Sequence, residues 1–161
     1  MEYLNLYDES GILTTEKGIR GVKSDRLVGI VIIFIENSKG EFLIQKTSSA
    51  RNSIFATTGG HVSFGSTFEE TVINEVKEEL GVDITNDNFV EVNTYIREYY
   101  VQKVYYLKKD IDKNDIKIQK DEVEYVEWLS KDKINELIKN NEFREGNIEG
   151  YKYIISNINT Q

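Results

Sequence analysis

The sequence predicts an α/β (α+β) fold in which helices cover both faces of a mixed β-sheet, an α/β/α sandwich. Segments rich in Val, Ile and Tyr, which favour strands, flank a strongly helical segment in the middle of the chain. These strands and helices do not follow the regular alternation of a parallel sheet, so we expect a mixed one. The 161 residues, 39% of them apolar, fit a single domain over 1–161 with a buried core.

The first half of the chain predicts two pairs of strands. Leu4–Leu13 has two short apolar stretches around an Asp/Ser/Gly turn, which indicates a hairpin at an edge of the sheet. Leu27–Ile35 is rich in Val and Ile, and turn residues 36–40 separate it from an alternating return strand over Glu41–Lys46. We expect this second pair to lie at the centre of the sheet.

A helix is predicted over Thr67–Leu80. Gly81 has the position of a helix stop, because glycine readily adopts the left-handed conformation that ends a helix. Two capping boxes have the right spacing at its start, Ser66 with Glu69 and Thr67 with Glu70.

The second half of the chain predicts further strands and two helices. Phe89–Leu107 is dense in Val, Ile and Tyr and is expected to form two antiparallel strands. Val123–Leu129 predicts another strand. Ser130 can cap a helix that runs to about Lys139, and a last helix is predicted near Ile148–Ile158.

Composition limits the classes of function. A net charge of −8 would repel nucleic-acid phosphates, so duplex nucleic acid is not expected as a partner. The chain has no cysteine, which excludes disulfides, zinc thiolate sites and a cysteine nucleophile. The longest apolar run, Leu27–Ile35, is too short to span a bilayer, and the start Met1-Glu2-Tyr3 lacks a signal-peptide pattern. We therefore expect a cytoplasmic protein with no membrane partner.

The predicted central helix carries a cluster of carboxylates beside its apolar face. Glu75, Glu78 and Glu79 lie within one helical turn, so they repel one another unless a cation neutralises them. Glutamate oxygens favour hard ions, and Mg²⁺ or Mn²⁺ is the expected cofactor. A solvated glutamate face is the alternative on helix spacing alone. The apolar side of the helix is formed by Val72, Ile73, Val76 and Leu80.

The segment from Gly60 to Val82 resembles the Nudix box, the loop-helix-loop signature of the Nudix hydrolase family. Two positions depart from the family pattern: Ser66 replaces a glutamate near the metal site, and Asn74 replaces an arginine that helps to orient the glutamates. The matching positions are Gly60, Glu75, Val76, Glu78, Glu79, Gly81 and Val82.

The resemblance extends along most of the chain. Segments 6–11, 40–46, 55–62 and 126–130 look like the Nudix branch related to isopentenyl-diphosphate isomerase. The resemblance implies the Nudix fold and hydrolysis of a diphosphate linkage in a small substrate of the nucleoside-diphosphate type or a related one. It also implies that Glu75, Glu78 and Glu79 bind the metal.

A further carboxylate is needed to take the proton from the attacking water. The candidates are Glu79 itself or a glutamate on a later loop, of which we choose Glu122 because it lies just before the Val123–Leu129 strand. Glu98, Asp121 and Glu124 stay open as alternatives, each with surface charge as the simpler explanation.

Several residues are candidates for substrate binding. Gly59 and Gly60 allow close approach of the backbone to a ligand, and His61, the single histidine, can contact a phosphate or serve as a structural loop residue. Arg51 can bind an anion as a forked donor and Lys46 as a point charge, although ordinary surface charge also explains both. Tyrosines in the predicted strands can stack a nucleobase but more often pack across strands.

Two rival functions differ in class from a hydrolase. A binding module would result if the departures at Ser66 and Asn74 abolished turnover while recognition persisted. An isomerase would need a cysteine, which the chain lacks, and Thr58 lies in the region where one would be sought. The hairpin near the amino terminus is a candidate contact for a homodimer.

Overall fold

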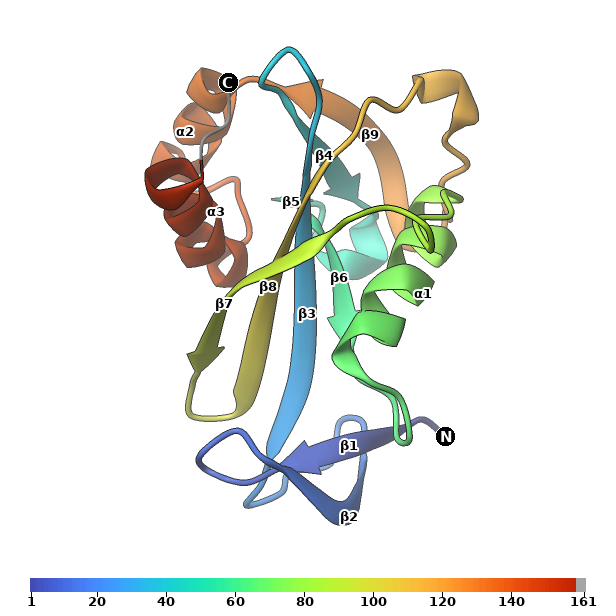
Figure 1. Cartoon of the computed structure of the whole chain (residues 1–161), viewed down its shortest axis with the longest axis vertical. Coiled ribbons are helices and arrows are strands. Elements are labelled where there is room, and N and C mark those ends of the chain that lie inside the picture. Colours follow the sequence, from blue (N-terminus) through green and yellow to red (C-terminus); the bar gives the residue numbers. More distant parts are fainter. Residues whose placement is uncertain (159–161) are drawn as a thin grey trace.

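The fold is built on one curled, mixed β-sheet (Figure 1). The computed structural model describes residues 1–158. Strand β3 runs through the middle of the molecule, and the β1–β2 hairpin crosses one of its ends. The strands are β1 (Tyr3–Tyr7), β2 (Leu13–Ile19), β3 (Leu27–Glu36), β4 (Phe42–Thr47), β5 (Phe55–Ala56), β6 (Thr58–His61), β7 (Val90–Ile96), β8 (Tyr100–Lys108) and β9 (Val123–Leu129).

The hairpin expected over Leu4–Leu13 is confirmed, but β3 and β4 do not form the expected central pair. They pair only where Glu36 lies opposite Phe42, beside the turn that joins them. The antiparallel strand β6 takes the next stretch of that edge of β3, while β4 diverges to pair with β5 and β9. On its other edge β3 pairs in parallel with β8 along its length, and β8 pairs with β7, so the sheet is mixed as expected.

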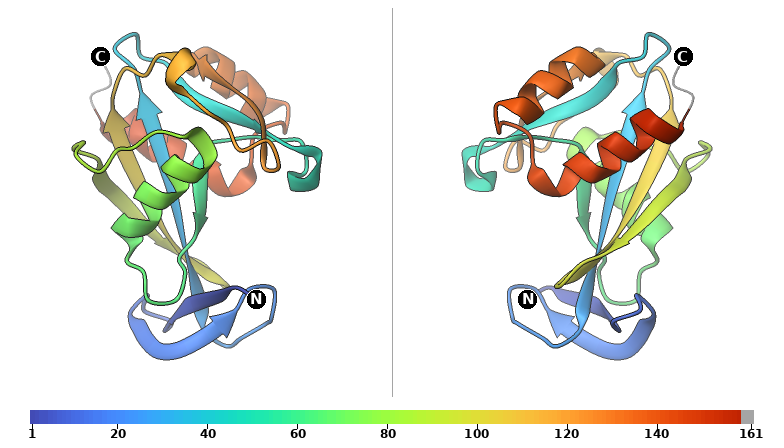
Figure 2. Two further views of the ribbon diagram at one scale, coloured as in Figure 1. Left: turned by 90° about the vertical axis from the view of Figure 1, so that its right-hand side faces the viewer. Right: turned by 90° about the vertical axis from the view of Figure 1, so that its left-hand side faces the viewer.

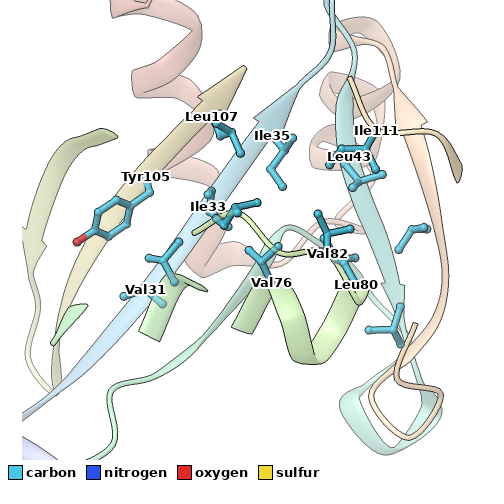
Figure 3. Close-up of a cluster of buried hydrophobic side chains, with 14 of the residues drawn as sticks. Val31, Ile33, Ile35, Leu43, Val76, Leu80, Val82, Tyr105, Leu107 and Ile111 are labelled. Atoms are coloured by element: carbon cyan, nitrogen blue, oxygen red, sulfur yellow. The ribbon is translucent and has the colours of Figure 1, made fainter. Parts of the chain in front are cut away.

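Helices cover both faces of the sheet, as the predicted sandwich requires (Figure 2). Helix α1 (Phe68–Leu80) lies on one face, and α2 (Lys131–Lys139) and α3 (Glu145–Asn157) lie on the other. Successive residues of β3 alternate between two apolar clusters because side chains of a strand point to opposite faces. On one face, Val31, Ile33 and Ile35 pack with Val76 and Leu80 of α1 (Figure 3). On the other face, Ile32 and Phe34 pack with Tyr151 and Ile154 of α3.

Local signals set the ends of α1 more clearly than those of α3. Thr67 and Glu70 form the capping box, so the alternative start at Ser66 is not used, and Gly81 ends α1 at a φ of 69°. Helix α3 begins at Glu145, earlier than expected. Its N-cap residue, Arg144, makes no capping side-chain hydrogen bond, so no capping signal in the sequence marks this start. Among residues 1–158, none of the helices has the length and apolar character needed to cross a bilayer.

Candidate active site

The glutamates of α1 lie against the backbone of β6. Gly59 and Gly60 pair with Ile32 and Val31 of β3, which places this flat, side-chain-free stretch beneath the helix. A Cβ atom at Gly60 would lie only 2.4 Å from the carboxyl carbon of Glu75. The missing side chain at Gly60 is therefore what allows the Glu75 carboxyl to rest on the sheet.

Glu75, Glu78 and Glu79 line one cavity of about 340 Å³, here called the carboxylate cavity. The expected separation of the helix faces is confirmed, since Val72 and Val76 are fully buried on the apolar side. Glu79 lies deeper than a helix-surface residue would, with 4% of its surface exposed. The other residues that line the carboxylate cavity are Glu2, Arg20, Arg51, Gly59, Gly60, His61, Ser63 and Glu122.

Burial dominates the electrostatics of these carboxyls. It raises the pKa of Glu79, and the hydrogen bond and charge of Glu75 raise it further, while a hydrogen bond from Gln45 opposes the shift. Burial likewise raises the pKa of Glu75, which is also raised by the charge of Glu78. A hydrogen bond between two carboxyls requires that one of them holds a proton. A proton shared between Glu75 and Glu79 would lower the repulsion between the two carboxyls.

The donor chemistry of the carboxylate cavity fits a hard divalent cation. Oε1 of Glu79 is buried and has no hydrogen-bond partner among the described residues, which is costly unless a proton or cation satisfies it. Within residues 1–158, no three acidic or histidine side chains already converge on one point as ligands. The glutamates nevertheless line a common cavity. Their flexible side chains would have to rotate before they could share an ion.

Glu122 and Arg51 form an ion pair at the carboxylate cavity. Their loops are joined by backbone contact, since Ser48 N donates to Glu122 O at 2.9 Å, and the Ser48 hydroxyl donates to Asp121 O. The loop before β9 is in turn attached to the end of α1, where Gln119 N donates to Glu79 O. Of the later carboxylates considered from the sequence, Glu98, Asp121 and Glu124 do not line the carboxylate cavity, whereas Glu122 does.

The structure also brings Gly59, Gly60 and His61 to the carboxylate cavity but not Lys46. The Lys46 ammonium lies 4.5 Å from the centre of the Phe55 ring, a cation–π contact on the neighbouring strand. Burial, followed by the positive charge of Arg20, lowers the pKa of His61, so this imidazole is neutral near pH 7.

Sequence reasoning missed the residues that reach the site from distant segments. Arg20 follows β2 and lines the carboxylate cavity, where its charge favours ionised Glu75. Gln45 points from β4 toward Glu79. No local spacing marks either residue, because each is brought to α1 by strand pairing rather than by its sequence neighbours.

The match to known proteins identifies the family. The model of the NUDIX domain matches residues 25–150, which includes the helix, the glycines and Glu122. The chain belongs to the Nudix family. Two uncharacterised Nudix hydrolases are similar to it over 89% of this chain and 88% of their own length, one from Listeria innocua at 32% identity and one from Listeria monocytogenes at 29%.

Solved structures show the same Nudix fold. A Deinococcus radiodurans protein shares 23% identity and a TM-score of 0.78, covering 91% of this chain and 94% of its own. A NUDIX-family hydrolase from Clostridium perfringens has 16% identity and a TM-score of 0.61, covering 81% of this chain and 98% of its own. Family membership supports a pyrophosphohydrolase that acts on acid anhydrides in small molecules.

The two departures from the Nudix box lie outside the carboxylate cavity. Ser66 belongs to the turn before α1, where its carbonyl accepts a hydrogen bond from Asn5 Nδ2 at 2.8 Å. Asn74 is exposed on α1. Neither residue lines the cavity formed by Glu75, Glu78 and Glu79.

Alanine at the two glycines of β6 should have different effects. Gly60→Ala should leave the fold intact, because the clashing Glu75 carboxyl can rotate away, but it should impair any function of that carboxyl. Gly59→Ala should destabilise the protein by about 1–3 kcal/mol, because its Cβ would lie 2.4 Å from the Val31 carbonyl oxygen, which cannot move freely. Urea unfolding of both variants checks this contrast, and equal losses of stability would contradict it.

The stability of the metal-free protein should depend on Glu79 and on pH. The folded-state pKa of Glu79 is raised above its ordinary value of 4.5, so the native state binds more protons than the unfolded state above that pH. Its contribution to the free energy of unfolding is therefore lost as pH rises, over about pH 5 to 9. Glu79→Gln should stabilise the chain relative to wild type increasingly over that range. Unfolding in chelator at several pH values tests this, and a difference independent of pH would contradict it.

Proposed function

We propose that this protein is a metal-dependent hydrolase that cleaves a diphosphate linkage in a small molecule of the nucleoside-diphosphate type or a related one, by attack of water at phosphorus. The observation that carries the proposal is the gathering of Glu75, Glu78, Glu79 and Glu122 around one cavity that also contains arginine. Carboxylates beside cationic side chains suit a substrate that arrives as a metal-bound polyanion.

Glu75, Glu78 and Glu79 are the residues proposed to bind Mg²⁺ or Mn²⁺. The unpartnered Oε1 of Glu79 supports this role, and so does the raised pKa of Glu75 and Glu79, because burial disfavours the ionised carboxylates and a bound cation would stabilise them. When bound, the metal would supply neutralisation of phosphoryl charge and a lower pKa for the attacking water. Glu79 keeps its second proposed role, as an alternative proton acceptor.

Glu122 is the proposed general base, and Arg51 the proposed ligand for a phosphoryl oxygen. In the free protein the Arg51 guanidinium and the Glu122 carboxylate are bound to each other in an ion pair. A phosphoryl group that takes over the forked donors of Arg51 would release the Glu122 carboxylate to accept a proton from water. Substrate binding and activation of the base would then be linked through one side chain.

The polar surroundings suggest how the rest of the substrate is bound. Gly59 and Gly60 offer close approach to backbone, and neutral His61 can donate one hydrogen bond and accept another. Lys46 keeps a proposed role only for a substrate that extends beyond the carboxylate cavity. A single domain, a cytoplasmic location, the absence of duplex nucleic acid and membrane as partners, and homodimerisation through the β1–β2 hairpin stay proposals.

A panel of nucleoside diphosphate derivatives and prenyl diphosphates tests the proposed reaction. With Mg²⁺ or Mn²⁺, wild type should release phosphate or pyrophosphate-linked products, and Glu79→Gln should lose the activity because it removes a carboxylate charge from the site. Glu69→Gln is the matched control, since Glu69 is an exposed glutamate of the same helix outside the carboxylate cavity. Turnover without a divalent cation, or an equal loss in both variants, would refute the proposal.

A ligand-binding module without turnover is the second candidate, and the departures from the family pattern at Ser66 and Asn74 favour it. The same panel separates the two functions when it is combined with melting temperatures. If wild type gains thermal stability with Mg²⁺, loses that gain in Glu78→Gln and cleaves nothing, the binding module is supported. The double change Ser66→Glu with Asn74→Arg would then show whether the altered positions abolished turnover.

Glu122 and Glu124 provide a second matched pair. Glu122→Gln should lower kcat by about 10²–10⁴-fold, the usual contribution of a general base, because the amide cannot accept the proton. Glu124→Gln should retain wild-type kcat, since Glu124 is exposed on β9 and lies outside the carboxylate cavity. Steady-state kinetics at saturating substrate measure both, and unchanged kcat in Glu122→Gln would return the role to Glu79.

A further inference from the structure

A second cavity adjoins the carboxylate cavity. It has a volume of about 330 Å³ and is here called the Arg144 pocket. The two cavities share Arg20, Arg51, Gly59, Gly60 and His61, so a ligand can extend from one into the other across the backbone of β6. The far wall of the Arg144 pocket is formed by Arg144, Gly146 and Asn147 at the start of α3 and by Tyr100 and Gln102 of β8.

Arg144 differs from the other two arginines of this pocket in having no acidic partner. Arg20 pairs with Glu2 at 3.1 Å, and Arg51 pairs with Glu122. Within residues 1–158 the Arg144 guanidinium forms neither an ion pair nor a hydrogen bond, although the residue is half-buried. Burial lowers the pKa of Arg144, the charge of Glu79 raises it, and the charge of Arg51 lowers it.

A half-buried cation next to a second cation is unfavourable without a counter-charge. The guanidinium has lost part of its hydration and Arg51 repels it, and the charge of Glu79, although it outweighs that repulsion, acts on Arg144 without forming an ion pair. A phosphoryl group would supply both the charge and the paired oxygens that match the forked donors of arginine. Arg144 therefore has the properties of an anion receptor whose partner is a ligand.

The backbone around Arg144 is held firmly. Arg144 N donates to Phe55 O at 2.8 Å, which joins the start of α3 to β5, and Asn147 N donates to Arg144 O. The Asn147 side chain accepts a hydrogen bond from Thr57 N at 3.0 Å, and Gln102 Nε2 donates to Gly146 O at 2.9 Å. These bonds fix the position from which the guanidinium extends, so binding need not order a loose loop.

We propose that Arg144 is a specificity-determining residue that binds a second phosphoryl group of the substrate, on the side of Gly59 and Gly60 away from the carboxylate helix. The inference rests on the proposed function for its biological meaning. The inference deepens that function, because Arg144 would favour substrates in which the group that enters the Arg144 pocket is an anionic phosphoryl group rather than a neutral sugar or an apolar chain.

Inorganic pyrophosphate is the direct probe, and its binding can be measured by calorimetry in chelator, without turnover or metal. Wild type should bind it, and Arg144→Ala should bind about 10–100-fold more weakly, as expected for loss of a charge-assisted contact. Arg144→Lys should fall between them, because it retains the charge but not the forked donors. The matched control is Arg97→Ala, since Arg97 pairs with Glu149 and lines neither cavity.

Three outcomes overturn the inference: no binding by wild type, equal binding by Arg144→Ala, or an equal loss in Arg97→Ala. Melting temperatures of Arg144→Ala and Arg144→Lys show whether each variant is folded. If Arg144→Ala is unfolded, the binding comparison is made with Arg144→Lys.

Kinetics separate this inference from the proposed function. With a substrate that wild type hydrolyses, Arg144→Ala should raise KM by about tenfold or more and change kcat less. The rise should be larger for substrates that carry an additional phosphoryl group than for those with a neutral group in its place. Turnover by Arg144→Ala with an unchanged KM would reject the role of Arg144 but not the hydrolase function. If wild type shows no turnover, the hydrolase function is rejected, and the pyrophosphate-binding measurement decides whether Arg144 binds a phosphoryl group.

Discussion

The packing of a carboxylate-bearing helix onto the bare backbone of β6 is the constraint on which the rest of the site depends. Val72, Val76 and Leu80 bury one side of α1 against the sheet, each contributing about 1.5–3 kcal/mol. The same contact buries Glu79 and brings Glu75 onto Gly60. Apolar packing therefore holds acids where they would not remain by themselves, and the raised pKa of both acids is its electrostatic consequence.

The positive charges that complement these acids come from elsewhere in the fold. Arg20 follows the first hairpin, Arg51 ends the short 3₁₀ helix (Ser49–Arg51) after β4, and Arg144 precedes α3. A polyanionic substrate needs cations nearby, yet placing all of them on α1 would have neutralised the glutamates directly. The arginines come from three segments, with Arg20 and Arg51 lining the carboxylate cavity and Arg144 the adjoining pocket, and Glu79 Oε1 has no hydrogen-bond partner within residues 1–158.

The loops around the site are tied to the helix and to each other, which makes the geometry a property of the whole fold. The segment before β9 contacts the end of α1 through Gln119 and the loop after β4 through Ser48. The ion pair between Arg51 and Glu122 completes that connection. Because these contacts join three elements, a ligand that displaces Glu122 from Arg51 alters the relation between two loops as well as one ion pair.

The sequence by itself determined the elements whose signals are local. The turn between the first strands, the helix over α1 with its capping box and Gly81, the strand over Val123–Leu129 and the cap at Ser130 all follow from residues a few positions apart. The family and its fold were expected from the resemblance of residues 60–82 to the Nudix box, and the match to the NUDIX domain confirms them. The turn, helix, strand and cap were predictable because hydrogen bonding and side-chain periodicity within one helix or strand act over short distances along the chain.

Only the tertiary structure decided which strands became neighbours and which side chains met. The parallel pairing of β3 with β8, and the insertion of β6 where β4 was expected, depend on contacts between segments far apart in sequence. Tertiary contacts also bring Arg20 and Gln45 to the carboxylates and Arg144 to the adjoining pocket, although no local pattern marks these residues. The sequence of a strand predicts which of its faces is apolar. It does not predict which strand will pair with its edge, because backbone hydrogen bonds are the same for every residue type.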